Sequence, residues 1–379
     1  MAEYREITII GASISGLSAA KELVERMPQA KITVYETKGD AGERIVCGGG
    51  MSKVMMDKVG LEVPKEFIAS PIHTVRVYAP NKRYWEFSGA EDYGYVIYRD
   101  RFETWLAEDL QKKGVTFKFN NPVTYRQGFL YDGICDQVLI EFPGESVFIG
   151  ADGISGASTQ YLEKYQKEDM YIGVQLTAEM EVHKHDLLEC YFGSRYAPKG
   201  YAWVFPEGYN KVRVGLGVPS DGRENVAQLL KNFVDDLGAQ PVTHMEAKML
   251  PTGKPPNNLV FSNLLLVGDA GHLCDPLHGG GIANAIASGK AAARAIAEGK
   301  LERYNAYVSW IMRANHQRYR YKNVIVGMGD EDLNELVRSL EDFKPATLRL
   351  SWALMQAVVT LALKNRRLLT KHKVLRRLI

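Results

Sequence analysis

Residues 264–282 constrain the fold more than any other stretch of the chain. Four apolar residues precede the pair Gly268-Asp269, and a run of glycines then leads into an alanine-rich segment from Ile282 to Ala297. The pattern predicts a buried strand, a tight turn and a helix. Because the first turn of a helix leaves its N–H groups unpaired, we expect these donors and a strand-end carboxylate to contact one cofactor. The residues concerned are Asp269, Gly280, Gly281 and Ile282.

A second nucleotide-handling segment lies near the start of the chain. Residues 5–10 and 31–36 are predicted to form buried parallel strands, with a helix between them from about residue 16 to residue 26. The turn after the first strand is a dinucleotide-binding pattern, and Glu36 is placed to accept hydrogen bonds from adenosine ribose hydroxyls. Two such segments, far apart in sequence, predict one flavin-sized cofactor held by both. The turn residues assigned to the cofactor are Gly11, Ser13 (where a glycine is usual), Ser15 and Gly16.

Composition narrows the class of protein. The chain has 379 residues, enough for two or three compact units, and its hydrophobic content of 46% is ordinary for a globular protein. A formal net charge of +2 gives no bulk reason to expect nucleic-acid binding. None of the four cysteines forms a CxxC pair, so we expect a reducing cytosol. The eight histidines show no ligand spacing, and we expect no metal.

The ends of the chain bear on localisation. A strand pattern begins almost at the first residue, which predicts no signal peptide. The longest apolar run, residues 352–363, is shorter than the ~20 residues that a spanning helix needs. Residues 364–379 carry seven Lys or Arg and no acidic residue, which suits an anionic membrane surface, packing against a partner, or a solvated end. We expect a cytoplasmic protein with peripheral contact at the inner face of the membrane.

The order of patterns predicts an α/β fold whose cofactor domain is interrupted. Residues 74–87 alternate as a hairpin, residues 101–113 as a helix and residues 171–218 as several strands, and the chain is helical after residue 299. The expected units are a cofactor domain (1–70, 96–158 and 255–300), an inserted antiparallel β-sheet substrate domain (71–95 and 159–254) and a helical C-terminal region (301–379).

Two further patterns complete a set of flavin motifs. Asp152-Gly153 follows a predicted strand, and Arg99 stands shortly before Phe102 at the start of a predicted helix. Together with the two segments above, they resemble flavoproteins of the p-hydroxybenzoate hydroxylase type. The resemblance implies a Rossmann-like FAD-binding domain in which Asp269 contacts the ribityl chain of FAD. It implies further FAD contacts from Val46, Cys47, Gly48, Arg99, Val123 and Asp152.

Two segments narrow this resemblance. Residues 46–50, Val-Cys-Gly-Gly-Gly, fall where the chain is expected to pass the isoalloxazine ring, and residues 198–206 complete the pattern PxxYxWxFP. Both resemble archaeal geranylgeranyl reductases, flavoproteins that saturate isoprenoid lipid chains, over roughly residues 5–300. The resemblance implies a prenylated glycerolipid or prenyl diphosphate as substrate, with NAD(P)H or ferredoxin as candidate electron donors.

The aromatic residues of this pattern suit such a substrate. Tyr201, Trp203 and Phe205 alternate along a predicted strand, so their rings share one face. Such a wall lines a lipid tunnel or forms ordinary core, and the family pattern favours the tunnel. We expect hydride transfer from reduced flavin to the alkene, with a proton from Cys47 or from a water held by Tyr201. The alternatives for Cys47 are a packed residue and a reversible pair with Cys274.

Two other functions fit the same fold. One is a monooxygenase that uses NAD(P)H and O2, and the aromatic pattern and the Cys-Gly pair speak against it. The other is a non-catalytic prenyl-lipid carrier of the kind that GDP-dissociation inhibitors represent, and the intact flavin motifs speak against that.

Overall fold

The first layer of the protein is a six-stranded, mostly parallel sheet. The computed structural model describes residues 4–88, 92–139, 146–162, 169–182, 184–341, 355–356 and 358–359. All pairings in this sheet are parallel except that of β18 with β19, so the carboxyl ends of its central strands share one edge. The strands, in spatial order, are β18 (Val260–Phe261), β19 (Leu264–Leu266), β11 (Val147–Gly150), β1 (Glu6–Ile10), β2 (Lys31–Tyr35) and β8 (Thr116–Lys118).

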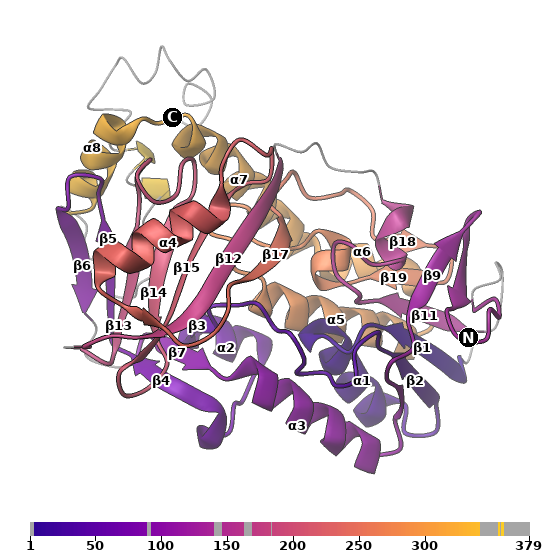
Figure 1. The fold of residues 1–379 in the computed structure, drawn as a ribbon. Helices are drawn as coiled ribbons and strands as arrows, with labels where there is room; N and C mark the ends of the chain where they lie inside the picture. The colour runs from indigo at the N-terminus through magenta and orange to yellow at the C-terminus, as the bar shows by residue number, and fades with distance from the viewer. Residues whose placement is uncertain are drawn as a thin grey trace.

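Helices from both ends of the chain pack together beside this sheet. The helix α1 (Ile14–Arg26) lies between α5 (Ile282–Ala297) and α3 (Arg99–Lys112) (Figure 1). Gly289 of α5 permits the close approach, because a Cβ there would collide with the Ser15 carbonyl of α1 and lie 3.1 Å from the Ala19 nitrogen. The two predicted cofactor segments are therefore brought into direct contact.

The second layer is an eight-stranded, largely antiparallel sheet. The helix α4 (Val226–Leu237) packs on one face of it, where Leu230 and Phe233 join the core. Only the pairing of β13 with β5 is parallel among the pairings described. The strands run in the order β16 (Gln240–Pro241), β12 (Met170–Glu179), β15 (Lys211–Pro219), β14 (Tyr201–Pro206), β13 (Leu187–Tyr191), β5 (Thr74–Tyr78) and β6 (Tyr84–Ser88), and β17 (Glu246–Pro251) also pairs with β12.

Smaller elements connect the two layers. A three-stranded sheet orders β3 (Gly50–Ser52), β7 (Gly94–Ile97) and β4 (Ile68–Ile72), and sequence reasoning did not anticipate it. A separate hairpin joins β9 (Val123–Arg126) to β10 (Phe129–Asp132). The remaining helices are α2 (Lys53–Val59), α6 (Tyr304–Tyr307), α7 (Ser309–Val326) and α8 (Asp330–Glu341), with single 3-10 turns at Lys65–Phe67, Ser158–Tyr161, Gly268–Gly271 and Leu301–Arg303.

The expected α/β class is confirmed, with a Rossmann-like sheet, a second antiparallel sheet and helices after residue 300 (Figure 1). The helix predicted over residues 101–113 begins two residues earlier, at Arg99, where the exposed Arg101 and Asp100 gave no apolar signal. The predicted domain boundaries remain a prediction. The basic segment 364–379 lies outside the described residues.

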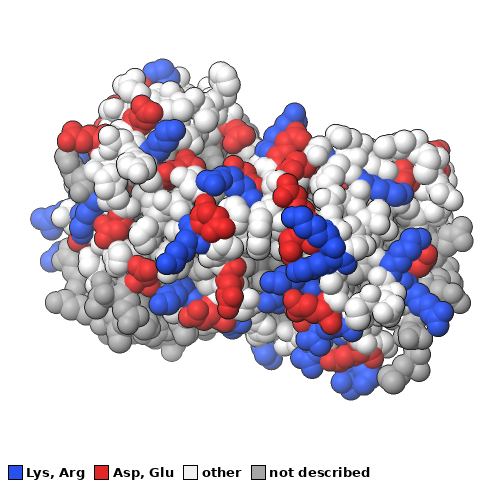
Figure 2. Space-filling view, turned by 90° about the horizontal axis from the view of Figure 1, so that it is seen from below, with Lys and Arg blue, Asp and Glu red and all other residues white. Residues whose placement is uncertain are grey.

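The hydropathy of the helices and the charge of the surface bear on contact with membranes and nucleic acids. Among the residues that the structure describes, no helix combines the length and the apolar character required to cross a bilayer. Figure 2 shows one face on which Lys and Arg side chains lie next to Asp and Glu side chains. Among the ion pairs of the described residues, the Lys113 ammonium lies 2.6 Å from the Asp109 carboxylate. This face is therefore not the uniformly basic surface that a nucleic-acid backbone selects.

Candidate functional site

The dinucleotide turn follows β1 and is built for close backbone approach. Gly11 has φ +102°, and a Cβ there would lie 2.5 Å from the Ala151 carbonyl oxygen. Ser13 takes the place of the usual middle glycine, and its hydroxyl donates to the same carbonyl at 2.8 Å. The Ser13 and Ser15 hydroxyls are 2.9 Å apart. Ser13 therefore turns its side chain into the protein and leaves the turn open.

Glu36 is fixed at the end of β2. Its Oε2 accepts a hydrogen bond from the Ala12 N–H at 2.8 Å, and its Oε1 accepts from the Lys38 N–H at 3.0 Å. The carboxylate therefore lies against the dinucleotide turn, where an adenosine ribose is expected. Each oxygen retains a lone pair for a ribose hydroxyl.

Asp152 follows β11, and its carboxylate accepts hydrogen bonds from within its own turn. Its carboxylate accepts hydrogen bonds from the Ser158 N–H at 2.9 Å and from the Ser158 hydroxyl. Burial raises the pKa of Asp152 to about 6, although the Ser158 donors favour the ionised form. A Cβ at Gly11 would also lie 2.8 Å from the Asp152 Cα, so the Asp152 backbone, rather than its carboxylate, borders the dinucleotide turn.

The second cofactor segment places a carboxylate beside a helix start. Asp269 follows β19, and a Cβ at Gly281 would lie 3.4 Å from its Oδ1. The Lys248 ammonium is 3.4 Å from Oδ2. Gly281 is the N-cap of α5 and Ile282 is its first residue, and no side chain caps this helix. The unpaired N–H groups therefore face the space beside Asp269.

These residues fit a dinucleotide cofactor. No side chain caps α1 either, so two uncapped helix starts and two carboxylates surround one region. A helix N-terminus binds anionic groups such as a pyrophosphate, and a carboxylate binds sugar hydroxyls. Val123 begins the separate β9–β10 hairpin. Its assignment to the cofactor remains a prediction.

A largely apolar cavity of about 800 Å³ lies between the glycine-rich loop 46–50 and the large sheet. Loop 46–50, the start of α5 and part of α7 all line it. Nine of the residues assigned from the sequence line this cavity: Val46, Cys47, Gly48, Tyr201, Trp203, Phe205, Gly280, Gly281 and Ile282.

The aromatic wall has the geometry that the strand alternation predicts. The ring centroids of Tyr201 and Trp203 are 5.8 Å apart, and those of Trp203 and Phe205 are 6.3 Å apart. The intervening Ala202 and Val204 face the opposite side and join the core under α4. The wall therefore borders the cavity, while Tyr201 and Phe205 also pack against a neighbouring hydrophobic cluster.

Glycines on the neighbouring strand make room for the wall. Trp203 and Gly215 are register partners on β14 and β15, and a Cβ at Gly215 would collide with the indole ring. A Cβ at Gly48 would likewise lie 2.7 Å from the Phe205 ring. The pattern Gly215-Leu-Gly217 was visible in the sequence, but its relation to Trp203 depends on strand pairing.

Tyr201 has a fixed hydroxyl. It donates to the His278 carbonyl at 2.6 Å, in the loop that leads to α5. Burial, with the nearby thiols and Asp275, raises the pKa of Tyr201 well above its ordinary value. The hydroxyl is therefore a stable hydrogen-bonding group that still has lone pairs to accept from a water.

Cys47 lies beside Arg99. Burial raises the pKa of the Cys47 thiol, but the Arg99 guanidinium, the Gly49 N–H and the Lys248 ammonium outweigh burial and lower it overall. The Gly49 nitrogen is 3.3 Å from the Cys47 Sγ. Arg99 is itself held by Glu103, whose Oε1 lies 2.7 Å from the Arg99 Nε. Arg99 therefore acts on the thiol as well as flanking the cofactor region.

Cys274 differs from Cys47. It is buried, its Sγ donates to the Gly279 carbonyl at 3.2 Å, and burial raises its pKa well above the ordinary value. Both cysteines are free in the structure. Their surroundings therefore lower the pKa of the Cys47 thiol and leave Cys274 as a packed thiol.

Similar sequences occur among geranylgeranyl reductases. A family model described as the geranylgeranyl reductase catalytic domain matches residues 156–250. The digeranylgeranylglycerophospholipid reductase of Methanothrix thermoacetophila is 28% identical over 91% of this chain and 94% of its own length. That of Methanosarcina acetivorans is 28% identical over 99% of this chain and 97% of its own length. The chain is therefore similar to geranylgeranyl reductases over most of its length.

Two solved structures have folds similar to that of this chain. A geranylgeranyl bacteriochlorophyll reductase-like protein from Thermoplasma acidophilum has a TM-score of 0.83 at 23% identity, with 98% of both chains covered. HpxO from Klebsiella pneumoniae, solved with FAD and uric acid, has a TM-score of 0.67 at 16% identity, with 91% of this chain and 94% of that chain covered.

Sequence reasoning missed several polar residues of this site. Lys248 on β17, Gln175 on β12 and Arg213 on β15 all come near loop 46–50 or Asp269. The only available signal was an Arg within the apolar run 212–218. A single charge of this kind does not reveal its partner.

Proposed function

We propose that this protein is an FAD-dependent reductase that saturates the C=C bonds of geranylgeranyl chains in archaeal-type membrane lipids. The observation that carries the proposal is the cavity, in which three aromatic side chains face the loop of Cys47 and the start of α5. The family match and the names of the relatives support the reaction class and a prenylated glycerophospholipid as substrate. The same match disfavours a monooxygenase and a non-catalytic carrier.

In this proposal the cofactor is the source of the hydride, and the protein positions the substrate and excludes water. FAD, when bound and reduced, delivers a hydride to the alkene. The residues proposed to hold it are those of the dinucleotide turn, with Glu36 at the ribose, Asp269 at the ribityl chain and Gly280–Ile282 near the ring. The apolar lining excludes water from the alkene, and the faces of Tyr201, Trp203 and Phe205 stabilise a cation-like carbon.

A proton must accompany the hydride, and Cys47 is the proposed donor. A general acid works best when its pKa lies near the working pH. Arg99 and Lys248 lower the pKa of the Cys47 thiol from its ordinary alkaline value, which moves it in that direction. A water held by the Tyr201 hydroxyl is the alternative donor. NAD(P)H or ferredoxin as electron donor and membrane contact through residues 364–379 belong to the same proposal.

The test is anaerobic turnover. The FAD-loaded protein, reduced with dithionite, is incubated with digeranylgeranylglyceryl phosphate, and mass spectrometry records gains of two hydrogens per double bond. Trp203→Ala is expected to lower turnover at least tenfold, because the wall loses its central ring. Tyr209→Ala is the matched control, because Tyr209 is 92% exposed in the turn after the same strand. No mass gain with any prenyl substrate would refute the reaction, and a hydroxylated product would favour the monooxygenase.

A further inference from the structure

Arg213 is a buried cation in a strand of small and apolar residues. It is the third residue of β15 and is 8% exposed, while its neighbours Val212 and Val214 join the core under α4. A buried charge is costly unless it is paired and hydrogen-bonded. The partners of Arg213 are therefore expected to be specific.

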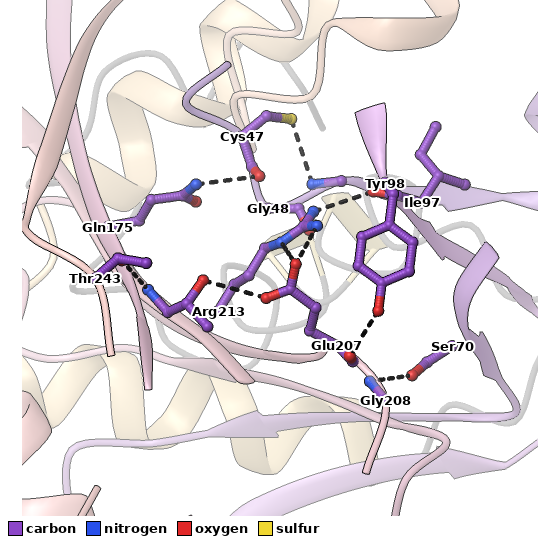
Figure 3. A network of polar contacts seen from close by, with 12 residues as sticks. Cys47, Gly48, Ser70, Ile97, Tyr98, Gln175, Glu207, Gly208, Arg213 and Thr243 are labelled. Carbon is purple, nitrogen blue, oxygen red and sulfur yellow. Dashed lines mark hydrogen bonds and ion pairs between the residues drawn. The ribbon is translucent and has the colours of Figure 1, made fainter. Parts of the chain in front are cut away.

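Glu207 anchors the guanidinium. Its Oε1 accepts from Arg213 Nη2 at 2.6 Å and from Nε at 3.1 Å, while its Oε2 accepts from the Thr177 hydroxyl at 3.1 Å. The Tyr98 hydroxyl donates to the Glu207 carbonyl at 3.0 Å. Figure 3 shows that this arrangement holds both Glu207 and one edge of the guanidinium in place.

The remaining nitrogen of Arg213 reaches two backbone carbonyls. Nη1 donates to the Ile97 carbonyl at 3.1 Å and to the Gly48 carbonyl at 3.3 Å (Figure 3). Gly48 directly follows Cys47, and Ile97 stands two residues before Arg99. One guanidinium therefore holds the two chain segments that carry the thiol and the cation beside it.

The loop is shaped to receive this contact. Gly49 has φ +76°, and a Cβ there would collide with Arg213 Nη1 and lie 2.6 Å from the Ile97 carbonyl oxygen. From the adjacent strand β12, Gln175 Nε2 donates to the Cys47 carbonyl at 3.2 Å. Thr177 on β12 and Arg213 on β15 are register partners, so the two strands lie side by side. Through Gln175 and Arg213, they hold the consecutive carbonyls of Cys47 and Gly48.

We propose that Arg213 is a positioning residue for Cys47, which it keeps beside Arg99 by holding the Gly48 and Ile97 carbonyls. The inference rests on the proposed function only for its catalytic meaning, because the contacts are tested without turnover. Lys is a poor substitute, because Arg213 makes four hydrogen bonds from three nitrogens of a planar group, whereas a Lys ammonium offers three donors on one nitrogen.

The expected consequence is electrostatic. The charged or titratable groups that act on Cys47 are Arg99 from α3, Lys248 from β17, Tyr201 from β14 and Cys274 before α5. Arg99 has the largest favourable effect on the thiolate. Releasing Gly48 and Ile97 from Arg213 separates the thiol from Arg99, while Lys248 stays in place on its own strand.

The test follows Cys47 directly. The FAD-loaded protein and its Arg213→Met and Arg213→Lys variants are alkylated with iodoacetamide over a range of pH, and peptide mass spectrometry gives the rate at Cys47. We expect the midpoint of the alkylation profile of Cys47 to rise by about one pH unit in R213M. The reason is that the thiolate loses the stabilisation that one nearby opposite charge provides. A smaller rise is expected in R213K. The exposed Cys135 in the same digest is the internal reference.

Arg76→Met is the matched control. Arg76 also pairs with a glutamate within the large sheet, since its Nε lies 2.8 Å from Glu86 Oε2. We expect R76M to leave the Cys47 profile unchanged. An unchanged profile in folded R213M, or an equal rise in R76M, would overturn the proposal.

Two additions keep the test decisive. If R213M does not fold, Glu207→Gln is expected to give a smaller upward shift, and no shift would overturn the proposal. If iodoacetamide does not reach Cys47, thiolate absorbance near 240 nm, measured against a Cys47→Ala background, gives the same midpoint. A rise without any lipid reduction would refute the proposed function while leaving the positioning role intact.

Discussion

The hydroxyl of Tyr201 donates a 2.6 Å hydrogen bond to the carbonyl of His278. This bond joins the aromatic wall on β14 to the loop that leads into α5. The proposed substrate side and the proposed cofactor side of the cavity are therefore linked by one buried contact. Residues 201 and 278 are far apart in the sequence, and the contact depends on the packing of the two sheets.

Tyr201→Phe tests this link. The substitution keeps the ring but leaves the His278 carbonyl without its donor, which is expected to destabilise the fold by about 1–2 kcal/mol. Chemical denaturation with tryptophan fluorescence measures the change. Tyr209→Phe, at a 92% exposed site, is expected to have no effect. Equal stability of Y201F and the parent protein would show that the bond contributes nothing.

Gly215→Ala tests the space under the wall. The new Cβ collides with the Trp203 ring, so the indole must move into the cavity. We expect a stability loss of about 1–3 kcal/mol, typical of overpacking, together with slower lipid reduction. Gly329→Ala is the control, because no other atom lies within 4 Å of a Cβ there. Normal turnover and an unchanged near-UV spectrum in G215A would contradict this account.

Glu36→Gln tests the adenosine end of the proposed FAD site. The amide loses the charge that receives the Ala12 and Lys38 N–H groups. Hydrogen bonds to a charged acceptor are stronger than neutral ones, so FAD binding is expected to weaken about tenfold. Fluorescence titration with FAD gives the dissociation constant. Glu6→Gln, which alters only an exposed pair with Lys31, is expected to bind FAD normally.

His272 predicts a pH dependence of stability. It is 4% exposed, and burial lowers its pKa from 6.5 to about 4, although Asp269 opposes the change. The unfolded chain therefore binds a proton at a higher pH than the folded protein, and stability falls as the pH drops from about 6.5 to about 4. The loss corresponds to about 3 kcal/mol at 1.36 kcal/mol per pKa unit.

His272→Asn isolates this contribution. Asn tolerates the left-handed backbone at this position, where φ is +51°. Denaturation curves at several pH values are expected to show a shallower acid loss in H272N than in the parent protein. Parallel curves for the two proteins would assign the acid loss to other groups.

The cofactor-binding half of the fold was predictable because its signals are local. Short apolar runs predicted the buried strands around Gly11 and Leu264, and the helix predicted from Ile282 to Ala297 has the bounds found in the structure. The three-stranded sheet of β3, β4 and β7 was not predicted. Its strands are short and come from separate parts of the chain, so no local period distinguishes them from loops.

Side-chain roles at the site were likewise predictable where they depend on local geometry, and not where they depend on tertiary contacts. The rings of Tyr201, Trp203 and Phe205 share a face because strand geometry alone requires it. The sequence assigned Asp152 to the cofactor by its motif, whereas its carboxylate is bound by Ser158. The effect of Arg99 on Cys47 was not predicted, because residues 47 and 99 are brought together by the pairing of β3 with β7 and by Arg213, which no local pattern records.

The sequence by itself determined the fold class, the cofactor turns and the aromatic wall, since each depends on residues close together in the chain. Only the tertiary structure decided which groups meet in the cavity. Arg213 contacts Gly48 and Ile97 because β15 packs under two segments that precede it by more than a hundred residues. Burial makes each of these polar groups require a partner, but the partner is set by sheet topology, which no local pattern records.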